Sequence, residues 1–160
     1  MRGGGTSSAT CSSRAIPEIA EAIAGELLAR SRMGPGSSMV RVALALGYEV
    51  AARQLPDGIA GASARGCRWI FVAPSGYRPR DEFTIAHELM ELHIPRSVLE
   101  LPRATKERFC DRGAAALLLP RGAFLRSLTQ HGWEIEQQRQ RWPLVSGRVI
   151  EARIYECAAP

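Results

Sequence analysis

The chain has 160 residues, of which 46% are hydrophobic, and a formal net charge of +5. This length suits one ordinary hydrophobic core. Apolar runs such as "AAALLL" are far shorter than the roughly 20 residues that cross a bilayer, and "MRGGGTSSATCSSR" lacks the apolar stretch of a secretory signal. We expect a cytoplasmic protein without membrane contact, in which a disordered tail (1–14) precedes one domain (15–130), with a C-terminal helical segment (131–160) packed on it.

The basic charge and the cysteines give information on the partners and the class of the protein. The positive charge comes almost wholly from arginine, since Lys106 is the only lysine among 21 basic residues, and it favours a nucleic-acid partner only weakly. Direct nucleic-acid binding is therefore an unlikely function. The four scattered cysteines form no C-x-x-C pair, which argues against a cysteine zinc site and a disulfide framework.

The first expected elements are two helices. "IPEIAEAIAGELLAR" has isoleucine and leucine at helical spacing, and Pro17 suits the first turn of this helix. After "GPGSS" interrupts the chain, "SSMVRVALALG" offers a serine cap, a short apolar helix and Gly47 as its C-terminal stop.

From Tyr48 onward the hydrophobic period changes to two, which predicts strands. "YEVAARQ", "IAGASARG" and "RWIFVAP" are the strand candidates, and Asp57 with Gly58 marks a turn between the first two. We expect a small antiparallel three-stranded sheet.

The remainder is predicted to be helical, so the fold class is α+β. In "RPRDEFTIAHELMELHIP", Asp81 as N-cap and Pro95 as stop predict a helix from about residue 82 to residue 93. "ATKERFCDRGAAALLLP" predicts a second helix, ended by Pro120. Two or three short amphipathic helices follow, separated by Gly132 and Pro143.

The first of these helices carries residues with metal-binding chemistry. Residues i and i+4 project from nearly the same face, so His87 and Glu91 can hold one ion. Glu88 occupies the position at which the glutamate of an H-E-x-x-H helix acts as a general base. His93 lies about 240 degrees round the helix from His87 and cannot join that ion. We expect His93 at the helix C-terminus, where an imidazolium suits the macrodipole.

A catalytic zinc ion needs a third protein ligand. The next helix offers Glu107 and, one turn on, Asp111, both opposite its apolar face. Each of these groups also has a simpler interpretation, because helical glutamates are usually a solvated face and a neighbouring histidine is usually a surface or capping residue. From the residues alone, both interpretations stay open.

The order of these segments resembles the ImmA/IrrE family of metallo-endopeptidases, which are zincin-like. "IFVAPSGYRPRDEFTIAHEL" is similar to the family's strand, arginine-bearing loop and "R-F-T-L-A-H-E-L-G-H" motif. "ERFCDRGAAALLLP" is similar to "E-R-E-A-N-R-F-A-A-E-L-L-M-P", and "WPLVSGRVIEARI" is similar to "F-x-V-S-x-x-A-V-x-x-R-L". The resemblance implies that residues 15–130 form a metallopeptidase-like domain, with the sheet packed on an active-site helix and several further helices.

The resemblance also assigns roles to single residues. His87 matches the first zinc histidine, Glu88 the catalytic glutamate and Glu107 the third ligand. Glu91 stands where the family has its second histidine, which is a departure. Asp111, where the family often has asparagine, is an alternate or supporting ligand, and Gly113 replaces a phenylalanine.

The substitution at Glu91 has a chemical consequence. One imidazole and two carboxylates are still an allowed zinc set, but they carry one more negative charge than two histidines and one glutamate. We expect a weaker Lewis acid and a shift in preference from zinc toward harder ions such as manganese.

The implied function is a metal-dependent endopeptidase that cleaves a regulatory protein, with a helix-turn-helix repressor as the expected partner. "RWIFVAP" is a candidate edge strand to which an extended substrate segment could add. The alternative is a weakly active or inactive family member that acts as a sensor or protein-binding module. A third hypothesis is DNA binding through the basic C-terminal helices.

Overall fold

A computed structural model describes residues 15–158, so the predicted tail (1–14) lies outside the described residues. In this part of the chain, helices and strands follow one another as α1 (Ile16–Ser31), α2 (Met39–Ala45), β1 (Glu49–Ala52), β2 (Gly61–Ser63), β3 (Trp69–Val72), α3 (Arg78–Leu92), α4 (Arg96–Leu99), α5 (Arg103–Leu118), α6 (Arg121–His131), α7 (Ile135–Arg141) and α8 (Gly147–Ala158). The α+β class is confirmed. The short helix α4 was not predicted.

The sheet is mixed, so the prediction of an antiparallel sheet is wrong. Its strand order is β1-β3-β2, with β3 parallel to β1 and antiparallel to β2. The loop 53–60 connects β1 to β2, which do not pair with each other, and β3 lies between them. Ile70 and Val72 make β3 the most buried strand, and the central position pairs both of its edges. The prediction that β3 is an edge strand is therefore also wrong, and β1 and β2 are the edges.

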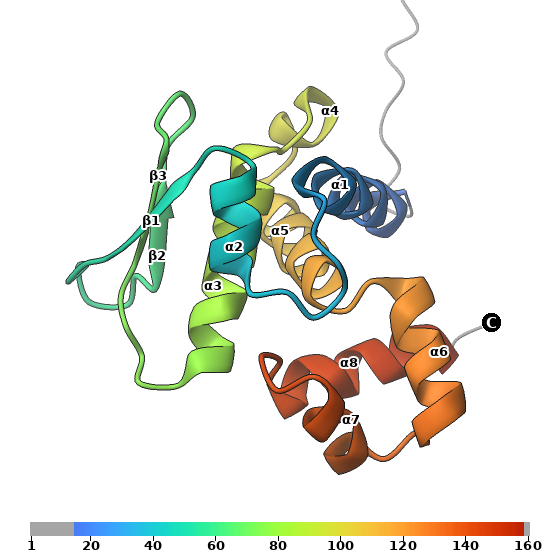
Figure 1. Ribbon diagram of the computed structural model, residues 1–160. Coiled ribbons are helices and arrows are strands. Elements are labelled where there is room, and N and C mark those ends of the chain that lie inside the picture. Colours follow the sequence, from blue (N-terminus) through green and yellow to red (C-terminus); the bar gives the residue numbers. More distant parts are fainter. Residues whose placement is uncertain (1–14, 159–160) are drawn as a thin grey trace, which may run out of the picture.

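The helix α3 occupies the middle of the molecule (Figure 1). The sheet lies on one side of it, and α5 and then α1 lie on the other side. Leu89 of α3, Phe109 and Leu117 of α5 and Leu27 of α1 are buried in the core between these helices. Within residues 15–158, none of the helices combines the length and apolarity needed to cross a membrane.

The start of α3 differs from the prediction. It begins at Arg78, with Pro79 in its first turn, and not near residue 82. Proline is common at this position because its fixed φ suits the first turn, and because a backbone N–H there would have no partner within the helix. Asp81 therefore lies inside the helix, where its carboxylate accepts hydrogen bonds from the backbone N–H and the hydroxyl of Ser75 in the preceding loop (3.0 and 2.6 Å).

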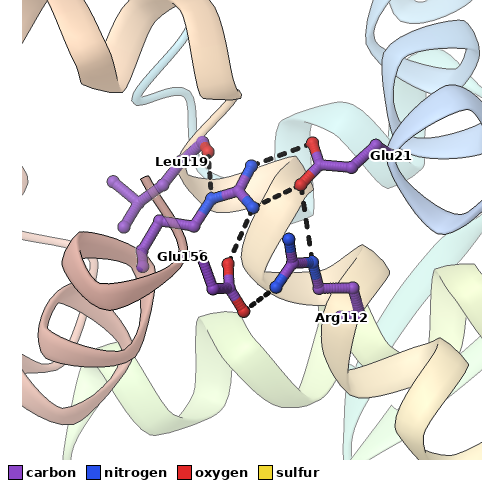
Figure 2. Close-up of polar contacts among 5 residues, drawn as sticks. Glu21, Arg112, Leu119 and Glu156 are labelled. Atoms are coloured by element: carbon purple, nitrogen blue, oxygen red, sulfur yellow. Dashed lines mark hydrogen bonds and ion pairs between the residues drawn. The ribbon is translucent and has the colours of Figure 1, made fainter. Parts of the chain in front are cut away.

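The C-terminal helix α8 is attached to the rest by a cluster of four charged side chains, shown in Figure 2. Arg153 of α8 is fully buried and donates to Glu21 of α1, to Glu156 and to the carbonyl of Leu119. Arg112 of α5 pairs with the same two glutamates. Two positive and two negative groups thus join α1, α5 and α8 without a net charge. This cluster holds α8 against α5.

Candidate active site

The structure brings His87 of α3 next to two carboxylates of α5. Its Nδ1 lies 2.9 Å from Oδ1 of Asp111, and its Nε2 lies 3.5 Å from Oε2 of Glu107. The imidazole is only 20% exposed, whereas the Glu107 and Asp111 side chains are 50% and 59% exposed. The acidic pair predicted from the sequence, Glu107 and Asp111, therefore meets His87 where α3 contacts α5.

The contact with Asp111 determines which imidazole nitrogen can bind a metal. An ionised carboxylate only accepts hydrogen bonds, so Nδ1 carries the proton and donates it to Asp111. In the neutral imidazole, Nε2 then has a free lone pair and lies 3.5 Å from another acceptor, the Glu107 carboxylate. Two acceptors this close together attract a proton or a cation.

The charges around His87 favour its protonated form when no metal is bound. Burial lowers the pKa of His87, but the hydrogen bond and the charge of Asp111, together with Glu88 and Glu107, outweigh burial and raise the pKa above its ordinary value. A cation at Nε2 would take the place of this proton.

Glu88 contacts the sheet. It is buried, and its Oε2 accepts a hydrogen bond from the Ser63 hydroxyl at the end of β2 (2.6 Å). Burial raises the pKa of Glu88, the Ser63 hydrogen bond lowers it, and Glu91 raises it again, so that the pKa lies above the ordinary value for glutamate. A carboxylate with a raised pKa suits the role of a general base near neutral pH.

Glu91 lines a cavity of about 340 Å³ together with His87, Glu107, Ser63 and Cys110. Burial, with the charges of Glu91 and Glu107, raises the pKa of the Cys110 thiol to about 12, so this cysteine is protonated at neutral pH. Among residues 15–158, no three His, Cys, Asp or Glu side chains are already drawn together around one point. The structure thus pairs His87 with Glu107 and places Glu91 in the wall of the same cavity.

The spacing of His87 and Glu107 fits two ligands of one divalent metal ion. Two ligands of one tetrahedral zinc ion, each bound at about 2.0–2.1 Å, lie roughly 3.4 Å apart, close to the 3.5 Å between His87 Nε2 and Glu107 Oε2. A ligating histidine commonly donates its other N–H to a carboxylate, as His87 does to Asp111. Asp111 therefore suits a supporting role better than that of a direct ligand.

His93 does not take part in this arrangement. It is the C-cap residue of α3, as expected, and its Nδ1 lies 2.7 Å from the carbonyl oxygen of Leu89. Its other nitrogen lies 3.4 Å from the Tyr48 hydroxyl.

Ser63 is the residue of the site that the sequence did not reveal. It lies in a glycine-rich segment that predicted only a weak strand. Its position at the polar end of that strand is the only local indication of a role. Its partner, Glu88, is 25 residues away in the sequence, so a local pattern does not connect the two.

Two glycines allow the close approaches that build the site. A Cβ atom at Gly61 of β2 would lie 2.6 Å from Thr84 and 2.8 Å from Glu88. A Cβ atom at Gly113 of α5 would lie 2.2 Å from the end of Met90 on α3. The first glycine sets the distance between the sheet and Glu88, and the second sets the distance between the helices that carry His87 and its acidic neighbours.

Comparisons with known proteins support this reading of the fold. No curated protein matches the chain. A solved structure of a Mycobacterium tuberculosis transcriptional regulator is similar, with a TM-score of 0.68 and 20% sequence identity over 83% of this chain. The similarity covers 45% of the regulator, so this chain spans less than half of that protein's length. At this identity the likeness shows the fold alone.

A family comparison is more specific. The model of peptidase family M78, described as the IrrE N-terminal-like domain, matches residues 48–154, which include α3, α5 and most of α8. This is more than half of the chain. The chain therefore belongs to the M78 metallopeptidase family, as the resemblance of its two motifs to ImmA/IrrE proteins indicated.

Proposed function

We propose that the protein is a metal-dependent endopeptidase whose ion is held by His87, Glu91 and Glu107. The observation that carries this proposal is the pair of acceptors, His87 Nε2 and Glu107 Oε2, which lie 3.5 Å apart in the wall of the cavity that Glu91 also lines. Zinc is the expected ion, and manganese also suits two carboxylates and one imidazole. When bound, the ion would polarise the scissile carbonyl and make a water molecule more acidic.

The chain's own residues supply the rest of the chemistry. Asp111 fixes the ring of His87 and its tautomer. Glu88 accepts a proton from the attacking water and returns it to the leaving amine, and its raised pKa brings its basicity closer to neutral pH. Ser63 holds the Glu88 carboxylate in place.

An extended substrate could pair with the edge strand next to the site. β2 pairs with β3 on one side only, and its last residue, Ser63, both contacts Glu88 and lines the cavity. A peptide added at the free edge of β2 would place its backbone beside these residues. The expected substrate is a regulatory protein, a helix-turn-helix repressor in the first instance.

A cleavage assay tests the proposal. The wild type and Glu88→Gln are incubated with zinc or manganese and with repressors encoded near the gene, and the products are identified by mass spectrometry. We expect specific cleavage by the wild type and its loss in Glu88→Gln with unchanged zinc content and unfolding temperature. Absence of both metal binding and cleavage would refute the enzyme and favour the sensor or binding module.

DNA binding through the C-terminal helices is a separate hypothesis. It predicts an affinity for duplex DNA that falls steeply with salt, because bound phosphates release counterions. A flat salt response would remove it.

A further inference from the structure

The structure has a second hollow, separate from the cavity of the candidate active site, and α5 lines part of it. It is a groove of about 930 Å³ between the start of α3, the outer face of α5, the start of α1 and the helix α8. Its walls contain apolar groups, among them Ile16, Phe83, Ala115 and Val149. A volume of this size is at the upper end of the range that holds a drug-sized ligand, so the groove has room for a segment of a few residues.

The charges in the groove are unbalanced. Four arginines and two carboxylates line it. Both carboxylates have partners, since Asp111 pairs with His87 and Glu156 pairs with Arg112 and Arg153.

Three arginines of the groove lack such partners. Arg80 of α3, Arg108 of α5 and Arg148 of α8 are exposed, and within residues 15–158 their guanidinium groups make neither an ion pair nor a hydrogen bond. They come from three different helices. The groove therefore combines apolar wall residues with three arginines that have no partner within residues 15–158.

From this combination we infer that the groove is a docking site for an acidic, partly apolar segment of a partner protein. Glutamate or aspartate side chains of the segment would pair with Arg80, Arg108 and Arg148, and its apolar side chains would cover Phe83 and Val149. Burial of these apolar groups would supply affinity, and the arginines would supply orientation.

Segments of this chain itself suit the groove less well. The fourteen residues that precede the described part contain Arg2 and Arg14 and no acidic residue, so they carry the same sign of charge as the groove. A second copy of the chain brings a net charge of +5. Charge complementarity thus favours a different, acidic protein.

The groove is preformed and adjoins the candidate active site. The cluster of Arg153, Glu21, Glu156 and Arg112 fixes α8, which forms one wall. Asp111 lines the groove and holds His87, while the preceding residue, Cys110, lines the cavity of the site. A protein docked in the groove would lie beside the site. The idea that this docked protein is also the substrate rests on the proposed function. The docking itself does not depend on that function.

A binding experiment on the full chain tests the docking site. The probe is a short fluorescein-labelled peptide of glutamate and leucine, with leucines at helical spacing, followed by fluorescence anisotropy. One companion peptide has lysine in place of every glutamate, and another has serine in place of every leucine. A single-stranded DNA oligonucleotide is the polyanion without apolar side chains. We expect the glutamate–leucine peptide to bind and all three companions to bind at least about fivefold more weakly.

Variants locate the binding surface. Arg148→Glu and Arg80→Glu should each weaken binding of the glutamate–leucine peptide by about fivefold to tenfold. Arg41→Glu changes another exposed arginine, on α2 outside the groove, and should leave it unchanged. The unfolding temperature of each variant shows that the fold is intact.

Three results would overturn the inference: no binding of the glutamate–leucine peptide, equal effects of Arg148→Glu and Arg41→Glu, or equally tight binding of the oligonucleotide. The last result would identify a general anion surface that suits nucleic acid. The assay is run in the Glu88→Gln background as well, so that cleavage plays no part. Failure of docking is then distinct from failure of the proposed enzyme.

Discussion

The Nδ1 atom of His87 lies 2.9 Å from Oδ1 of Asp111, and this contact turns the other ring nitrogen toward Glu107. A histidine held in this way by a carboxylate presents a fixed tautomer and a more basic Nε2. The residue that the family often replaces with asparagine therefore has a definite task in this chain.

The substitution Asp111→Asn should change the pH dependence of metal binding. In the metal-free protein the pKa of His87 is raised by Asp111, Glu88 and Glu107 against the effect of burial. A raised pKa means that the charged histidine stabilises the metal-free fold at pH values below its ordinary pKa of about 6.5, and that this stabilisation is lost as the pH rises through the folded-state pKa. The proton also competes with the metal over that range, so zinc affinity should rise with pH until His87 is neutral.

Asparagine keeps an acceptor for Nδ1–H but removes the negative charge. We expect the pKa of His87 to fall, and zinc affinity at pH 8 to fall by about tenfold or more because the supporting carboxylate is lost. Histidine resonances in an NMR titration and zinc competition with a chelator measure both quantities. An unchanged pKa of His87 in Asp111→Asn would contradict this description.

Ser63→Ala should alter catalysis through Glu88. Its hydroxyl donates to the buried Glu88 carboxylate and lowers a pKa that burial raises. Without this hydrogen bond the pKa of Glu88 rises further, so the acid limb of the kcat/KM profile should move to higher pH. Ser97→Ala, an exposed serine on α4, is the control and should leave the profile unchanged. A uniform loss of activity without a shift would indicate that Ser63 acts only through packing.

Gly61→Ala should disturb the same contact from the sheet side. The added Cβ would lie 2.6 Å from the Thr84 side chain and 2.8 Å from the Glu88 carboxylate, so β2 or these side chains must shift. We expect a loss of about 1–3 kcal/mol in the free energy of unfolding. Gly25→Ala in α1, where the added methyl group meets nothing within 4 Å, should instead stabilise the protein by up to about 1 kcal/mol. Chemical denaturation of both variants checks this, and equal effects would refute the close approach of β2.

Met90 and Gly113 should behave as a coupled pair. Met90 is fully buried and packs onto Gly113 where α3 crosses α5. In the family motifs these positions carry glycine and phenylalanine. The bulky side chain is therefore on α3 in this chain, whereas the family motif has it at the position of Gly113 on α5. Met90→Gly should cost about 3 kcal/mol or more through a cavity and a glycine within the helix, and Gly113→Phe alone should destabilise through overpacking.

The double variant Met90→Gly/Gly113→Phe should be more stable than the sum of the two single changes predicts. A positive coupling of about 1 kcal/mol or more in a double-mutant cycle would support compensation. Additive effects would show that the two positions do not share one packing space.

The helices were predictable because their signals are local. Pro17, Gly47, Pro120, Gly132 and Pro143 mark starts and stops that a short window reveals, and α1, α2, α5 and the C-terminal helices follow them. The start of α3 was misplaced because two start signals compete, and Pro79 prevails over Asp81, which instead binds Ser75.

The order of the strands was not predictable from a local pattern. Three short strands with one turn signal suit a meander. The parallel pairing of β1 with β3 instead depends on which strand buries the most apolar side chains in the central position. For the same reason, the edge strand next to the site is β2, which carries Ser63.

Helical phase correctly separated His93 from His87 and grouped Glu107 with Asp111. It could not show that Asp111 would contact Nδ1 and Glu107 would face Nε2, because that depends on the crossing of α3 and α5 at Met90 and Gly113. The assignment of His87, Glu91 and Glu107 as metal ligands and of Glu88 as the catalytic residue stays a prediction.

The most direct measurement is a crystal structure of the protein soaked in zinc, with the ion located by its anomalous signal. The proposed site predicts one ion bound by Nε2 of His87 and by carboxylate oxygens of Glu91 and Glu107 at about 2.0–2.2 Å, with Asp111 still accepting from Nδ1. An ion that leaves out Glu91, or a cavity that binds no ion at a saturating zinc concentration, would contradict it.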